Sequence, residues 1–262
     1  MQRLDMYLFD KGLASSRTKA KELISQGKVT VDGQVVTKPS CSVGDDSCID
    51  IFQTDNYVGR GALKLKKAFD IFHLNVKDKV CADIGASTGG FTQVLLENGA
   101  KFVYAVDVGH GQLANKLSSD DRVKNCEGVN IRYIEPDFFD NKVEFMCCDL
   151  SFISLTLTVP AMISALTDGG ELVTLIKPQF EAGREALNKK GIVTDRKKHI
   201  EVLNMLTAFF DGSGMSIIGL DYSPVRGGDG NIEYLAYMKK SQEASAWIDT
   251  RKIVFNAFEN SK

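Results

Sequence analysis

Four charged residues stand where a folded chain seldom leaves a charge without a partner. Lys177 directly follows the apolar run "LVTLI", and Asp149 directly follows "FMCC". Glu233 opens the run "EYLAYM", and Lys64 lies in the stretch "GRGALKL", which reads as a helix. Taken singly, each is explained by a surface charge or a structural ion pair. Two amines and two carboxylates that met in one cleft could pair with one another and assist a proton transfer.

A second group of residues suits a cofactor. The stretch "CADIGASTGGFT" sets Asp83, Gly85, Gly89 and Gly90 at a turn after an apolar run, and glycines let a ligand approach the backbone. Asp107 ends the next apolar run, where an acid can accept hydrogen bonds from ribose hydroxyls. Dinucleotide and S-adenosylmethionine sites share these features, and a turn that serves only packing is the simpler alternative.

Two details favour S-adenosylmethionine over a dinucleotide. The glycine spacing is not that of the dinucleotide fingerprint GxGxxG. A carboxylate at Asp83 would repel a pyrophosphate, whereas it could attract the cationic, amino-bearing end of S-adenosylmethionine. Asn130, which follows the third apolar run, is a further candidate for a contact with adenine.

The elements that must position these residues follow from an alternation of strand and helix patterns. Apolar strand-like runs near 79–87, 102–109, 124–130, 145–154 and 171–178 are separated by helical patterns, one of them over 156–169. This alternation predicts an α/β fold with a doubly wound, mostly parallel sheet. After a helix at 195–211, two strands follow without a helix between them, which suits the antiparallel strand near the end of a class I methyltransferase sheet. Ligands bind outside the carboxyl ends of such strands.

The first fifty residues form a separate pattern. Two short helices, near 2–12 and 16–26, precede "KVTVDGQVVT", in which Asp32-Gly33 is a strong hairpin signal. Residues 1–40 hold seven basic and four acidic residues. A solvated face is the usual explanation of such bases, but their clustering on a helix and a hairpin favours phosphate contact. The whole segment closely resembles an S4 domain, a small α+β RNA-binding module. The resemblance implies that RNA is bound by Arg3, Arg17, Thr18, Lys21 and Lys28.

A second resemblance spans nearly the whole chain. The stretches "GRGALKL", "DIGASTGGFT", "CDLSFISL", "LIKPQFEAG" and "GGDGNIEYL" look like the motifs of TlyA-type (haemolysin A-like) ribosomal RNA 2'-O-methyltransferases. These enzymes join an S4 domain to an FtsJ-like methyltransferase domain. The resemblance implies an S4 domain at 1–52, a linker at 53–58 and a methyltransferase domain at 59–262. It also implies methylation of a cytidine ribose in ribosomal RNA, with S-adenosyl-L-methionine as the methyl donor.

The Lys-Asp-Lys-Glu tetrad of this family falls on Lys64, Asp149, Lys177 and Glu233. A ribose 2'-hydroxyl is a poor nucleophile until its proton is removed. A lysine can remove it only when uncharged; burial and a second ammonium favour that form, whereas nearby carboxylates oppose it. We therefore predict that Lys177 is the base and that Lys64 stabilises the developing alkoxide. Asp149 and Glu233 would orient the two amines.

The remaining predicted site residues divide by ligand. For the cofactor we expect contacts from Asp83, Gly85, Ser87, Thr88, Gly89, Gly90, Phe91, Asp107, Val108, Asn130 and Asp149. For RNA we add Arg60 to the five residues of the S4 segment. No metal site is expected, because the three histidines are isolated and no cysteine forms a CxxC pair.

Composition limits the partners and the location. The chain has 262 residues, a net charge of −2 and no apolar run near the roughly 18 residues of a membrane span. The six cysteines lie mainly in apolar stretches, so we expect them to be reduced and packed. We expect a cytoplasmic monomer that binds ribosomal RNA or ribosomal subunits, and neither membrane nor DNA.

Several alternatives compete with ribose methylation. Base N-methylation would favour a proline-rich aromatic loop where the chain has "DLSF", and carbon-5 methylation would require a nucleophilic cysteine, for which Cys147 and Cys148 are the candidates. A non-catalytic RNA-binding or ribosome-assembly protein with a cofactor-binding domain is a further possibility. A haemolysin is the least favoured, since neither a signal peptide nor a long amphipathic span is recognisable.

Overall fold

The computed structural model describes residues 2–14, 16–44, 47–51, 57–228 and 230–260. The chain divides into two compact units, Met1–Asn56 and Tyr57–Lys262. The linker predicted at 53–58 lies mostly outside the described residues. Each unit is therefore considered by itself.

The first unit is a small α+β module with its own core. Its elements are β1 (Gln2–Arg3), α1 (Leu4–Asp10), α2 (Arg17–Ser25), β2 (Val29–Val31), β3 (Gln34–Val35), β4 (Ser42–Val43) and β5 (Ile49–Ile51). Ser16 caps α2 by accepting a hydrogen bond from the Lys19 amide. Asp32 and Gly33 both have positive φ, as the predicted two-residue hairpin between β2 and β3 requires. Apolar side chains of both helices pack over β2 to form the core.

The second unit is built on a seven-stranded sheet. Its strands are β6 (Val80–Ile84), β7 (Phe102–Asp107), β8 (Val123–Glu127), β9 (Val143–Cys148), β10 (Leu166–Ile176), β11 (Met215–Tyr222) and β12 (Tyr234–Lys240). Its helices are α3 (Ala62–Phe72), α4 (Gly90–Glu97), α5 (Asn115–Ser118), α6 (Leu155–Ala165), α7 (Pro178–Glu181), α8 (Arg196–Gly212) and α9 (Thr250–Asn260).

The strand order is β11-β12-β10-β9-β6-β7-β8. The pairs among β10, β9, β6, β7 and β8 are parallel, and β12 is antiparallel to both β10 and β11. This is the class I methyltransferase sheet, so the predicted fold is confirmed, including its single antiparallel strand. Some boundaries were predicted wrongly: residues 2–3 form β1 and not the start of the first helix, and residues 166–169 belong to β10 and not to the helix before it. The extension is irregular, with a register shift between Leu166 and Glu171.

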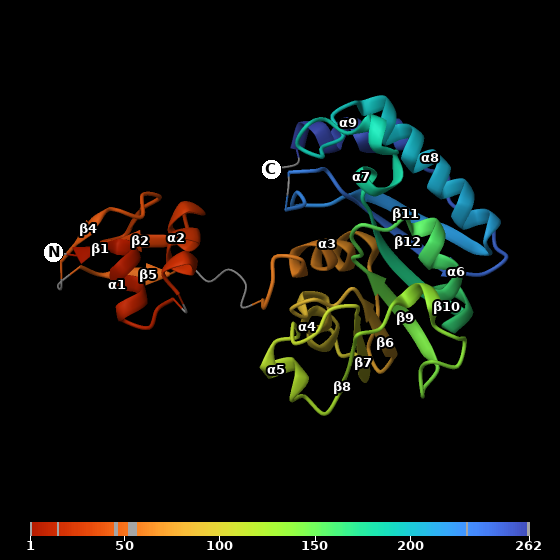
Figure 1. The fold of residues 1–262 in the computed structure, drawn as a ribbon, viewed down its shortest axis with the longest axis horizontal. Helices are drawn as coiled ribbons and strands as arrows, with labels where there is room; N and C mark the ends of the chain where they lie inside the picture. Colours follow the sequence, from red (N-terminus) through yellow and green to blue (C-terminus); the bar gives the residue numbers. More distant parts are fainter. Residues whose placement is uncertain (1, 15, 45–46, 52–56, 229, 261–262) are drawn as a thin grey trace. The chain divides into compact units, whose positions relative to one another are not determined.

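Helices cover both faces of this sheet (Figure 1). One buried cluster unites side chains of α3, α4 and α5 with the sheet, and the other unites side chains of α6, α8 and α9 with the opposite face. The central strands are therefore apolar on both sides, and polar side chains collect at their carboxyl ends. Among the described residues, no helix has both the length and the apolar character needed to cross a bilayer.

Candidate active site

The four charged residues singled out in the sequence form one chain of ion pairs. Lys177 Nζ lies 2.7 Å from Asp149 Oδ1, and Lys64 Nζ lies 3.1 Å from Asp149 Oδ2. Lys64 Nζ also lies 2.7 Å from Glu233 Oε2. Asp149 thus bridges the two amines, and Lys64 bridges the two carboxylates. All four side chains are largely buried, Glu233 most completely at 3% exposure.

The cluster comes together because four elements end or begin at the same edge of the sheet. Asp149 follows β9, Lys177 follows β10, and Glu233 directly precedes β12, which runs antiparallel beside β10. Lys64 lies in the first turn of α3. Pro178 occupies the first position of α7, where its missing N–H is no loss, so β10 ends immediately after it presents Lys177.

The electrostatics of the cluster favour the charged form of Lys64. Burial alone would lower the pKa of Lys64, but the carboxylates of Asp149 and Glu233 outweigh it, and the pKa is raised. Burial alone would raise the pKa of Asp149, but the ammonium groups of Lys64 and Lys177 lower it. Lys64 is therefore a permanent cation at neutral pH, and Asp149 is a permanent anion.

The glycine-rich turn lies beside this cluster. Gly85 has φ of +81°, and a Cβ there would stand 2.7 Å from the Asp149 carbonyl oxygen. Only glycine lets the turn approach the end of β9 so closely. Gly89 also has positive φ, but a Cβ there would meet the side chains of Leu113 and Leu117. Gly89 thus serves close packing and lies away from the cavities.

The structure places the Asp83 carboxyl away from any ligand. Asp83 is fully buried, and its Oδ2 accepts hydrogen bonds from the Thr92 amide at 2.8 Å and the Thr92 hydroxyl at 2.7 Å. Burial raises the pKa of Asp83 to about 7, against the lowering effect of these bonds. The predicted direct contact with the cofactor is therefore not supported by this geometry. Asp83 instead ties the end of β6 to α4.

Asp107 occupies the predicted place at the end of β7. Its Oδ2 accepts a hydrogen bond from the Ser87 amide at 2.8 Å, and its Oδ1 accepts one from the Gly109 amide at 2.7 Å. Each oxygen keeps a second lone pair. Asp107, Val108 and Asn130 line a cavity of about 200 Å³ whose other walls are mostly apolar, from Val106, Val129, Ile131, Leu150 and Ile153.

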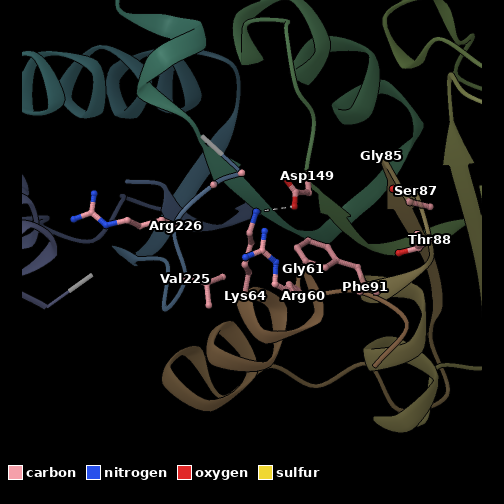
Figure 2. A pocket seen from close by; sticks show the side chains of 15 residues that line it. Arg60, Gly61, Lys64, Gly85, Ser87, Thr88, Phe91, Asp149, Val225 and Arg226 are labelled. Carbon is pink, nitrogen blue, oxygen red and sulfur yellow. Dashed lines mark hydrogen bonds and ion pairs between the residues drawn. The ribbon is translucent and has the colours of Figure 1, made fainter. Parts of the chain in front are cut away.

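A second cavity of about 280 Å³ shares Gly85 with the first. Its lining includes the predicted cofactor residues Gly85, Ser87, Thr88, Gly90, Phe91 and Asp149, together with Arg60 and Lys64. Figure 2 shows Lys64 and Asp149 facing each other in this cavity, with the glycine-rich turn on one side and Val225 and Arg226 on the other. Arg60, predicted to bind RNA, thus lies at the mouth of the same site.

The two adjoining cavities fit the parts of S-adenosylmethionine. The mostly apolar cavity with the Asp107 carboxylate suits a nucleoside, because the carboxylate can accept from ribose hydroxyls and the apolar walls can hold a base. The neighbouring cavity is polar and contains the Asp149 carboxylate and the start of α4. A cavity suited to a nucleoside thus adjoins the cavity that contains Lys64 and Asp149, an arrangement that suits methyl transfer.

Three residues near the cluster escaped sequence reasoning. The Ser151 hydroxyl accepts a hydrogen bond from Lys177 Nζ at 2.9 Å. Phe152 has φ of +64° and is 88% exposed, which is unusual for a bulky residue. Its ring lies 5.1 Å from that of Phe180, which follows Lys177 by one short turn. Of the four residues in "DLSF", the sequence singled out Asp149 alone as a site residue.

The predicted RNA-binding residues of the first unit lie on its surface. Arg3 and Arg17 are about half exposed, and both pair with the buried Asp5, Arg3 at 2.9 Å and Arg17 at 3.8 Å. Thr18 and Lys21 are exposed on α2, and Lys28 is partly buried just before β2. Asp5 thus holds two arginines near the start of α2, beside Thr18 and Lys21.

The two cysteines next to Asp149 are core residues. Cys147 and Cys148 are fully buried in β9. Burial raises the pKa of both thiols, that of Cys148 to about 12. A thiolate nucleophile at neutral pH is therefore disfavoured, and with it the carbon-5 alternative.

Comparison with known proteins identifies relatives along both units. A family model described as FtsJ-like methyltransferase matches residues 57–240, and one described as S4 domain matches residues 2–45. The Bacillus subtilis protein YqxC, named as an rRNA methyltransferase, is 47% identical over 90% of this chain and 85% of its own length. The 16S/23S rRNA (cytidine-2'-O)-methyltransferase TlyA of Mycobacterium tuberculosis is 39% identical over 90% of this chain and 89% of its own length.

Solved structures agree with these matches. A Streptococcus thermophilus protein named as a hemolysin superposes with a TM-score of 0.79 at 44% sequence identity. The superposition covers 99% of this chain and 96% of that protein. The similarity therefore extends through both units.

Proposed function

The chain belongs to the FtsJ-like methyltransferase family, and we propose that it transfers a methyl group from S-adenosylmethionine to the 2'-hydroxyl of a cytidine in ribosomal RNA. The observation that carries the proposal is the Lys64–Asp149–Lys177–Glu233 cluster beside a nucleoside-shaped cavity. The relatives named as rRNA methyltransferases supply the substrate class.

The partners of the two lysines support the assignment of Lys177 as the base. Lys64 contacts two carboxylates, which raise its pKa, so it remains charged. Lys177 contacts one carboxylate and one neutral hydroxyl, that of Ser151. Because Lys177 contacts one carboxylate where Lys64 contacts two, we assign the base to Lys177.

Bound S-adenosylmethionine supplies an electrophilic methyl group. Lys177 takes the proton of the ribose 2'-hydroxyl as the oxygen becomes nucleophilic. Lys64 provides a fixed positive charge toward the alkoxide character that develops on this oxygen. Asp149 holds both amines through its two oxygens, and Glu233 holds Lys64 from the other side. A positioned base contributes about 10²–10⁴-fold in rate.

Recognition of RNA would use both units. The exposed cations of the S4 unit suit the phosphates of folded RNA. In the second unit, Phe152 directly follows Ser151, and its exposed ring lies close to that of Phe180, beside the cluster. Ribosomal RNA is recognised largely by shape and by unstacked bases, which aromatic side chains can stack upon. Phe152 is therefore our candidate for contact with an unstacked nucleotide.

The test uses ribosomal subunits and a methyl-labelled donor, followed by mapping of the modified nucleotide. The expected result is label on a ribose. Lys177→Ala should retain donor binding by calorimetry and lose methyl transfer, whereas the exposed Lys252→Ala should behave like the parent protein. Label on a base would refute ribose methylation, and near-normal turnover of Lys177→Ala would refute the assignment of the base.

The non-catalytic alternative gives a different pattern in the same experiment. An RNA-binding assembly protein would bind the donor and the ribosomal subunit without transferring label. That outcome, with a correctly folded protein, would replace the enzymatic proposal.

A further inference from the structure

Ser151 is a hydrogen-bond partner of Lys177 that the charged cluster leaves without a role. It lies two residues after Asp149, in the loop that follows β9. Its side chain is exposed and lines the nucleoside-shaped cavity, whereas Lys177 is only 7% exposed. The hydroxyl therefore connects the buried amine with the ligand cavity.

The geometry around Lys177 Nζ limits where a substrate can approach. A neutral amine has four tetrahedral positions, occupied by its own Cε, two hydrogens and one lone pair. Among the described residues, Nζ has two close oxygen partners, Asp149 Oδ1 at 2.7 Å and Ser151 Oγ at 2.9 Å. If both partners accept a hydrogen from the neutral amine, the lone pair has a single remaining direction.

We infer that Ser151 is a positioning residue that fixes the direction of the Lys177 lone pair for proton abstraction. The inference rests on the proposed function, because it needs Lys177 as the base. With Asp149 alone, one hydrogen of the amine is fixed and the lone pair can take either of the two remaining positions. A hydroxyl suits this task because its oxygen accepts from the amine in either protonation state. It can stay bonded to Lys177 before and after the proton arrives.

The loop around Ser151 is held in place. Phe152 adopts φ of +64°, a conformation that bulky residues rarely take, and its ring rests against Phe180. Two residues further on, the Ser154 hydroxyl donates to Glu181 Oε2 at 2.6 Å, and the Leu155 amide donates to Glu181 Oε1 at 2.8 Å. The loop after β9 is thus fastened to α7, the helix that directly follows Lys177.

Three variants test the inference. Ser151→Ala removes the acceptor, Ser151→Thr keeps a hydroxyl at the same position, and Ser164→Ala removes an exposed hydroxyl on α6 as a control. We expect Ser151→Ala to lower kcat by about 3- to 10-fold, the effect of losing one hydrogen bond between neutral groups. The KM for RNA should change by less than about twofold, because uniform binding of the RNA is untouched. Ser151→Thr should restore most of the rate.

The pH profile of single-turnover methyl transfer separates aiming from a change in protonation. If Ser151 aims the lone pair, the deficit of Ser151→Ala persists at the alkaline end of the profile. A deficit that disappears there would overturn the inference, as would unchanged kcat or a loss confined to donor binding. Failure of the parent protein to methylate ribose would instead refute the proposed function, so the two failures are distinguishable.

Discussion

The Lys64–Glu233 pair offers the most direct test of how the cluster is held together. Replacing Lys64 with Met removes the cation and keeps a side chain of similar length. Glu233, only 3% exposed, then loses its cationic partner among the described residues, while Asp149 keeps Lys177. The cluster changes from two positive and two negative charges to one positive and two negative.

The structure sets the size of the effect. At the observed 2.7 Å, unit charges attract by about 6 kcal/mol if the effective dielectric constant is about 20. Desolvation offsets much of this attraction in the intact protein. Removal of one partner leaves the other buried and unpaired, which costs about 3–5 kcal/mol. We therefore expect Lys64→Met to lower the free energy of unfolding of the second unit by about that amount.

The double variant Lys64→Met/Glu233→Gln supplies the control. It removes both charges, so the orphaned carboxylate disappears and part of the stability should return. The difference from the sum of the single variants should be at least about 2 kcal/mol, since contacting residues do not act additively. Urea denaturation followed by circular dichroism measures all four proteins. Additive effects, or a loss below about 1 kcal/mol in Lys64→Met, would show that the pair is not buried and coupled as described.

Three further predictions concern residues around the cluster. Burial raises the pKa of Asp83 to about 7 from 3.8, so the folded state binds more protons than the unfolded state between these pH values. Stability therefore falls as pH rises through that window, by about 4 kcal/mol in total. Asp83→Asn should remove this slope in urea titrations from pH 4 to 7, and an unchanged slope would contradict the prediction. Asp107→Ala should weaken donor binding by about 10- to 100-fold in calorimetry, because it removes the proposed acceptor for the ribose hydroxyls and the hydrogen bond that fastens the Ser87 turn. Equal affinity would remove Asp107 from the proposed site. Phe152→Ala should raise KM for ribosomal RNA by about 5-fold or more, the lower end of one stacked base, with no change in unfolding because the ring is 88% exposed; Phe255→Ala, which alters another exposed ring, is its control.

The sequence predicted the frame of the second unit well because its signals are periodic. Apolar runs that alternate with helical patterns determine a parallel sheet, and the carboxyl ends of such strands share one edge. That rule alone placed Asp149 and Lys177 together. The boundary of β10 was missed because its first residues, "LTDGG", have the composition of a turn and join the sheet through an irregular register.

The sequence said least about the directions of side chains at the site. The position of Asp83 at a strand end indicates proximity to the cofactor, yet it says nothing about the direction of the carboxyl. The amide and the hydroxyl of Thr92, nine residues later, both donate hydrogen bonds to this carboxyl and hold it inside the protein. Ser151 was missed for the converse reason, since a serine in a loop has no periodicity and its importance arises only from the amine that reaches it.

The different roles proposed for the two lysines follow from the oxygens that surround them. Lys64 lies between two carboxylates and is buried with them, so its charge is stabilised by neighbours that cannot leave. Lys177 shares one of those carboxylates and turns its other side to a hydroxyl that is open to the cavity. A second carboxylate would stabilise an ammonium further, whereas a hydroxyl brings no charge. In the proposed mechanism, the asymmetry between Glu233 and Ser151 therefore lets two chemically identical side chains take the roles of fixed cation and base.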